Sequence, residues 1–228
     1  MEYGYIKKNF EELRRELSEL GRRAGREITL VCVTKSGSDE ELEALVRAGA
    51  TDIGENRPGE LKRRGELLAG LGLNPTLHEI GTLQKNKVKY IIDKAALIHS
   101  VDSLALAEEI SRRALKIGRR VPVLLEINSA KEESKSGAMP EDALTLAKEI
   151  SALEGVSLRG VMTMGPALDD PELLRPYFRL AKGIFDRLKS DRLIEGDGIL
   201  SMGMSDSYRV AVEEGSTLVR VGRILFKK

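Results

Sequence analysis

The feature that constrains the fold most is an apolar segment followed by an amphipathic helix, a unit that recurs along the whole chain. The helical segment at residues 6–24 comes first, because its apolar residues recur in steps of four and three. Apolar strands that alternate with helices are typical of a parallel sheet covered by helices. We predict seven helices between eight strands, at residues 28–35, 51–54, 76–81, 96–101, 121–128, 157–165, 198–204 and 217–222.

Eight such units in 228 residues predict one domain over residues 1–228, a (β/α)8 TIM barrel in the α/β class. The additional N-terminal helix would occupy the eighth position around the barrel. An open, doubly wound sheet is the alternative, and it usually carries a glycine-rich turn after the first strand. Residues 34–38 read TKSGS and lack the G-x-G-x-x-G spacing, so the barrel is the expected fold.

Composition excludes several classes of function. The chain has 37 Lys and Arg against 36 Asp and Glu, and this balance argues against a nucleic-acid-binding protein. No apolar run approaches the ~18 residues of a membrane helix. The N-terminus lacks the apolar core of a signal peptide, so we expect a cytoplasmic protein. A single cysteine, Cys32, and two histidines give no basis for a disulfide or a metal site.

Function in a barrel of this kind collects where the strands end, at the carboxyl face. Lys35 directly follows the apolar run LVCV, so we expect it at the mouth beside a low-dielectric wall. Burial there would disfavour the ammonium form. The neutral amine could then attack a carbonyl and form a Schiff base. A solvated lysine on an exposed turn is the alternative.

The ends of the last two predicted strands form a second candidate site, since barrels often hold a phosphate in these loops. The segment SMGMS supplies the hydroxyl of Ser201. The segment VRVGR supplies the backbone N–H groups of Gly222 and Arg223, and glycine lets an anion approach closely. Ordinary tight turns are the alternative. Together with an amine at Lys35, these loops describe a site for a phosphorylated aldehyde.

Eight segments carry a resemblance that covers nearly the whole chain. The chain resembles the YggS/PROSC family of pyridoxal phosphate (PLP) homeostasis proteins, and through it the barrel domain of alanine racemase, a fold-type III PLP-binding barrel. The matching segments are VTK (33–35), DIGEN (52–56), IGTLQKNK (80–87), HSVDS (99–103), INSAKEESKSG (127–137), GVMTMGP (160–166), LSMGMSDSY (200–208) and EEGSTLVRVGR (213–223).

The resemblance implies a role for each candidate residue. Lys35 would hold PLP as a covalent Schiff base, and Asn56 would lie beside the cofactor ring. Ser201 and the backbone of Gly222 and Arg223 would hold the phosphate. Arg220 would face the pyridine nitrogen, where a permanent cation disfavours protonation and so restrains carbanion chemistry.

Several other polar residues receive a structural interpretation. His78 and His99 are expected to be hydrogen-bonded barrel residues rather than general bases. The charged loop from Lys131 to Ser136 is interpreted as solvated, with a lid over the mouth as the alternative. Lys135, within the 129–139 loop, falls on the cofactor side, and the sequence assigns it no role.

The expected function is intracellular PLP homeostasis, in which the protein stores, buffers or delivers PLP without a dedicated catalytic reaction. Apo PLP-dependent enzymes are the partners that this implies, and we expect a monomer. A PLP-dependent amino-acid racemase with weak activity is the alternative. Racemisation needs a second base opposite Lys35, which the racemases take from a second domain. The chain stops at Lys228 without such a domain, and Tyr208 is interpreted as part of a helix.

Overall fold

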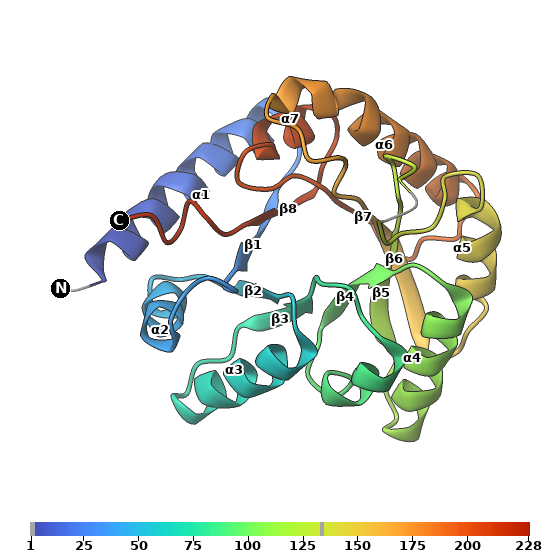
Figure 1. Cartoon of the computed structure of the whole chain (residues 1–228), viewed down its shortest axis with the longest axis horizontal. Helices are drawn as coiled ribbons and strands as arrows, with labels where there is room; N and C mark the ends of the chain where they lie inside the picture. The colour runs from blue at the N-terminus through green and yellow to red at the C-terminus, as the bar shows by residue number, and fades with distance from the viewer. Residues whose placement is uncertain (1–2, 133–134) are drawn as a thin grey trace.

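The computed structural model describes residues 3–132 and 135–228 and confirms the closed barrel. Eight parallel strands pair in chain order, and β8 closes the sheet against β1 (Figure 1). The strands are β1 (Thr29–Val33), β2 (Asp52–Glu55), β3 (Thr76–Glu79), β4 (Leu97–Val101), β5 (Val121–Glu126), β6 (Val156–Met162), β7 (Ile199–Ser201) and β8 (Leu218–Val221).

Helices surround the strands on the outside of the barrel (Figure 1). They are α1 (Gly4–Ala24), α2 (Asp39–Arg47), α3 (Pro58–Gly70), η1 (Lys85–Tyr90), α4 (Leu104–Lys116), α5 (Ala143–Ser151), η2 (Pro171–Leu174), α6 (Arg175–Ser190) and α7 (Tyr208–Glu213). Ser38 and Glu41 form the predicted capping box at the start of α2. The helix expected from residue 84 to 92 is a short 3-10 helix instead, η1.

Most of the predicted strand ends at the mouth were wrong: six strands stop earlier, β2 runs one residue further, and β4 ends at Val101 as predicted. The strand expected over residues 198–204 ends at Ser201, where it pairs with Leu218 of β8. Gly203 then adopts a φ of 94°, which turns the chain out of the sheet. Residues 202–205 therefore form a loop over the mouth rather than a continuation of β7.

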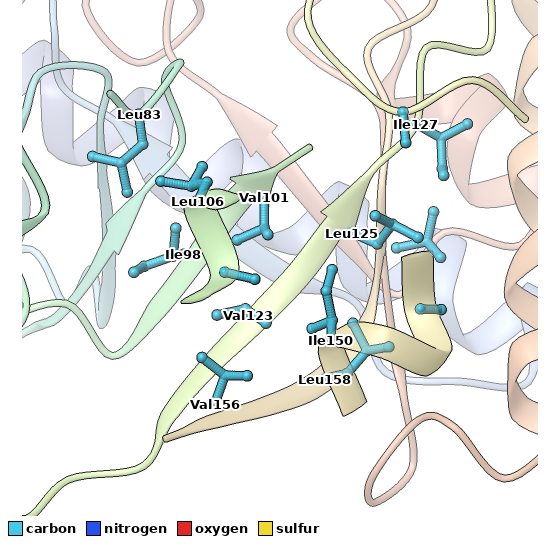
Figure 2. Packing of buried hydrophobic residues seen from close by; sticks show 14 of the residues in the cluster. Leu83, Ile98, Val101, Leu106, Val123, Leu125, Ile127, Ile150, Val156 and Leu158 are labelled. Carbon is cyan, nitrogen blue, oxygen red and sulfur yellow. The ribbon is translucent and has the colours of Figure 1, made fainter. Parts of the chain in front are cut away.

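The apolar core has an inner and an outer part. Buried residues from five strands form a cluster of strand residues alone, which fills the barrel interior: Val31, Leu97, Leu124, Met162 and Leu218. Outside the strands, a larger cluster joins β4, β5 and β6 to the covering helices. Figure 2 shows the labelled residues Val123 and Leu125 of β5 among side chains of the neighbouring strands and of the covering helices, such as Leu106 and Ile150. The strands are thus covered on both faces, as the apolar segments predict.

The N-terminal helix completes the outer layer, as predicted. One face of α1 buries Ile6, Phe10, Leu13 and Leu17 against α2, α7 and the adjoining strands. The side-chain amide of Asn9 donates to the carbonyl oxygen of Lys227 at 2.8 Å, so the chain's end lies along α1 (Figure 1). Within the described residues, no helix is long and apolar enough to cross a membrane.

Candidate functional site

Lys35 lies in a tight turn that leaves β1 at the mouth of the barrel. The N–H of Gly37 donates to the carbonyl of Thr34 at 2.9 Å and closes this turn. The expected burial of Lys35 is wrong: its side chain is exposed and lines a cavity at the mouth. It forms no ion pair with any described residue, so the amine is accessible to a ligand.

A buried ion pair fixes the turn that carries Lys35. Arg64 of α3 donates to the carbonyl oxygens of Thr34 and Gly37, at 2.6 Å each, and so grips both ends of the turn. Its Nη1 also lies 2.6 Å from Oε1 of Glu55, the last residue of β2, and the hydroxyl of Thr34 donates to the same oxygen. The side chains of Arg64 and Glu55 are 8% and 3% exposed. The backbone around Lys35 is therefore held from below by a charged network.

Sequence reasoning missed Arg64, although the sequence contains a sign of it. Arg64 stands between Leu61 and Leu68 at spacings of three and four, on the buried face of α3. A cation at such a position needs a buried partner. The strand end that precedes α3 supplies one, in Glu55.

The cavity at the mouth has a volume of about 490 Å³, within the usual range for a small-molecule site. The ends of β1, β2 and β8 form its floor and one side, and the loops after β6 and β7 form the other side. The structure brings five of the six predicted site residues to this cavity: Lys35, Asn56, Arg220, Gly222 and Arg223.

The sixth predicted residue, Ser201, does not line this cavity, and its phosphate contact stays a prediction. Its hydroxyl is fully buried inside the barrel, where it accepts from Arg220 and lies 3.0 Å from Nδ1 of His99. Ser205, four residues further along, does line the cavity, as do Ser207 and Ser36. The N–H of Gly222 approaches the Oγ of Ser205 to 3.4 Å, so the loop after β7 meets the end of β8 at this point.

Arg220 is a buried cation beneath the cavity. Its Nη2 donates to the carbonyl of Thr163 at 3.1 Å, and its Nη1 donates to Ser201. Burial lowers the pKa of Arg220 to about 10, against the opposing effect of the Glu126 carboxylate. The guanidinium thus stays charged at neutral pH, and Arg220 is one of the residues that line the cavity.

Two further observations indicate that the cavity is shaped for a ligand. The side-chain oxygen of Asn56 is buried yet has no hydrogen-bond partner among the described residues. A Cβ at Gly222 would lie 2.8 Å from the carbonyl oxygen of Val33, so only glycine lets the backbone pass this close. An unpartnered buried acceptor and a bare backbone are both typical of a site that a polar ligand completes.

Lys135 lines a neighbouring cavity of about 220 Å³. Glu126 and Ser136 line it too, and Met164 and Met204 lie on the border that it shares with the larger cavity. The ammonium of Lys135 pairs with Glu132 at 2.9 Å. Residues 133–134 of this loop lie outside the described residues, and the interpretation of the loop as solvated or as a lid stays a prediction.

Comparison with known proteins identifies close relatives over nearly the whole chain. Residues 9–228 match the family model described as "Alanine racemase, N-terminal domain". A pyridoxal phosphate homeostasis protein of Aquifex aeolicus is 41% identical over 197 residues, which cover 86% of this chain and 85% of the relative. A protein of the same name from Helicobacter pylori is 37% identical over 203 residues, 88% of each chain.

Comparison with solved structures agrees with these sequence matches. PipY of Synechococcus elongatus, with PLP bound, superposes with a TM-score of 0.85 at 30% identity and covers 97% of this chain and 100% of its own. An alanine racemase of Clostridium difficile is 18% identical with a TM-score of 0.73, covering 94% of this chain and 59% of the racemase. The match to the racemase shows a similarity of fold alone.

Proposed function

This chain belongs to the alanine racemase N-terminal domain family and, within it, to the pyridoxal phosphate homeostasis proteins, and from this premise we propose how its own residues hold PLP. The protein binds pyridoxal 5'-phosphate and acts in PLP homeostasis. The observation that carries the proposed site is the joint lining of one cavity by Lys35, Asn56, Arg220 and the loop pair at Ser205 and Gly222.

Lys35 is the proposed covalent attachment point. PLP supplies, when bound, an aldehyde that condenses reversibly with a primary amine. The buried network of Arg64 and Glu55 fixes the turn, so the amine of Lys35 projects from a rigid support into the cavity. Because a second primary amine can compete for the same aldehyde, attachment at an exposed lysine allows release as well as storage.

The phosphate end is assigned to the loops after β7 and β8. The hydroxyl of Ser205 and the backbone N–H groups of Gly222 and Arg223 are donors in one corner of the cavity. Backbone N–H groups and a hydroxyl can bind phosphate oxygens without a metal ion. Ser205 thus makes, in this proposal, the side-chain phosphate contact that the resemblance implies for Ser201.

The ring end is assigned to Asn56 and Arg220. Arg220 is charged at neutral pH and presents only donors, so it would leave a pyridine nitrogen unprotonated. An unprotonated ring withdraws electrons less strongly, which suits a protein that keeps PLP rather than one that reacts it with amino acids. We propose that the bound PLP is then transferred to apo PLP-dependent enzymes.

The test is borohydride reduction of the protein mixed with PLP, followed by peptide mass mapping. We expect one adduct, on Lys35, in the wild type and none on that peptide in Lys35→Ala. Lys85→Ala, a change to an exposed lysine on η1, is the control and should keep the adduct. Labelling scattered over surface lysines in the wild type would contradict the proposal.

A further inference from the structure

A continuous chain of hydrogen-bonded side chains runs through the barrel interior beneath the cavity. The imidazole Nε2 of His78 lies 3.0 Å from Oδ1 of Asp52, and its Nδ1 lies 3.0 Å from Nε2 of His99. Nδ1 of His99 lies 3.0 Å from Oγ of Ser201, which in turn contacts Nη1 of Arg220. Asp52 is the first residue of β2, so the chain spans from the opposite end of the barrel to the mouth.

The chain crosses the barrel rather than following its wall. His99 belongs to β4 and Ser201 to β7, two strands that are not neighbours in the sheet. Both side chains are fully buried, and His78 is 4% exposed. Polar groups placed this deep are costly unless each one has a partner, so a complete chain needs a reason beyond packing.

Donor and acceptor chemistry favours one order of protons along the chain. A guanidinium has donors only, so Oγ of Ser201 accepts from Arg220. The Ser201 proton is then free to donate to Nδ1 of His99, and in this order Nδ1 carries no proton. His99 therefore carries its proton on Nε2 and donates to Nδ1 of His78. His78 in turn carries its proton on Nε2 and donates to the carboxylate of Asp52.

The opposite order of protons is disfavoured on two counts. It would make His78 a donor at both nitrogens, an imidazolium, in the same interior as Arg220. It would also leave the hydroxyl proton of Ser201 without an acceptor in the chain. Burial, together with the charge of Arg220, holds the pKa of His99 well below its usual value. Burial opposes ionisation of Asp52, but hydrogen bonds from His78 and Thr51 outweigh it, and the pKa of Asp52 is lowered.

We propose that His78 and His99, both neutral with the proton on Nε2, are positioning residues that orient Ser201 and through it the guanidinium of Arg220 toward the cofactor cavity. Asp52 anchors the far end as the acceptor that ends the chain. This inference rests on the proposed function for the role of Arg220, while the order of protons is a property of the ligand-free protein.

The order of protons can be read directly by nitrogen-15 NMR of the imidazole rings. His78 and His99 are the only histidines in the sequence, so the two ring systems are assigned by one substitution. We expect both rings to be neutral Nε2–H tautomers at neutral pH in the ligand-free protein. A proton on Nδ1 of either ring, or a charged His78, would overturn the proposal.

The positioning role is tested with bound PLP as the reporter. His99→Leu removes the acceptor of the Ser201 proton, so we expect PLP binding to weaken about tenfold and its absorption band to shift. His99→Asn places an amide near the former Nδ1 and should restore the band in part. Leu124→Ala, in the same interior but outside the chain, is the control: it should lower stability and leave the band unchanged.

The outcomes separate the two proposals. An unchanged band and an unchanged dissociation constant in a folded His99→Leu protein would overturn the positioning role. If the wild type forms no adduct on Lys35, the proposed function fails, whereas the NMR result still decides the order of protons.

Discussion

Polar groups at the mouth of the barrel and polar groups beneath it differ in the hydrogen-bond and ion-pair partners that the folded chain gives them. At the mouth, Lys35 is exposed without an ion pair to any described residue, and the oxygen of Asn56 is buried without a partner. Beneath it, Ser201, His99 and Arg64 each make at least two polar contacts. The lower groups stabilise the fold, and the upper ones are left for a ligand.

This contrast gives a rule for separating structural from functional residues here. Removal of a satisfied buried group leaves its partner unpaired, and the cost appears in the free energy of unfolding. Removal of the Lys35 or Asn56 side chain at the mouth leaves no described group unpaired in the ligand-free protein, so its cost appears in PLP binding. Each prediction below assigns one residue to one of these two measurements.

The largest expected effect is on the buried ion pair that holds the turn of Lys35. Arg64→Met leaves the Glu55 carboxylate buried without its cation and frees the carbonyls of Thr34 and Gly37. We expect the free energy of unfolding to fall by about 3–5 kcal/mol, measured by urea denaturation. Arg63→Met is the control on the same helix: its ion pairs are exposed, and it should cost about 1 kcal/mol or less. Equal losses in the two variants would contradict the buried role.

The next effect concerns Glu79, which pairs in register with Glu55 and forms no ion pair with a described residue. One of its oxygens is buried without a partner among the described residues. Burial raises the pKa of Glu79 to about 8, with a smaller contribution from Glu55. A raised carboxyl pKa means that the folded state holds the proton more tightly. The associated stability is therefore complete below the ordinary pKa of about 4.3 and is lost as pH rises to about 8.

We expect the free energy of unfolding to fall with pH between those limits, by at most about 1.4 kcal/mol per pH unit. Glu79→Gln should reduce this slope, because the amide keeps the shape and cannot ionise, while Glu126, whose pKa burial also raises, keeps its own part. Glu66→Gln, at an exposed position on α3, should leave the slope in place. Denaturation curves over a pH series check it, and a slope unchanged in Glu79→Gln would assign it to another group.

The fold followed from the sequence, because most strands are rich in β-branched and apolar residues and most helices have an apolar face. Most strand ends did not follow, because an end such as that of β7, where Ser201 pairs with Leu218, depends on a neighbouring strand. That difference separates the two serines of the site. Ser201 is the last residue of its strand and faces the interior, whereas Ser205 follows a turn at Gly203 and faces the mouth.

The two serines form a matched pair that tests the contrast within one short segment. Ser201→Ala leaves Arg220 and His99 without a shared partner, so unfolding should become easier by about 1–3 kcal/mol. Ser205→Ala should change stability by less than about 0.5 kcal/mol, since its hydroxyl lies at the cavity. It should instead weaken PLP binding about tenfold, the value of one hydrogen bond to a charged group. The reverse pattern would restore Ser201 as the phosphate contact.

The smallest effect is expected at Arg223, whose proposed contact with PLP is made by the backbone. Its guanidinium pairs with Asp206, and the two side chains are 72% and 69% exposed, so solvent screens both. Arg223→Ala keeps the backbone N–H and should change the dissociation constant of PLP by less than about threefold, and by less still at high salt.

Gly222→Ala, one residue earlier, forces a Cβ against the carbonyl of Val33 and should weaken binding more than Arg223→Ala does. Titration of the two variants at low and high salt therefore separates charge from backbone shape. A larger, salt-sensitive loss of PLP affinity in Arg223→Ala would show that the side chain itself binds the phosphate. The donors at the mouth would then include the Arg223 guanidinium as well as the backbone N–H groups.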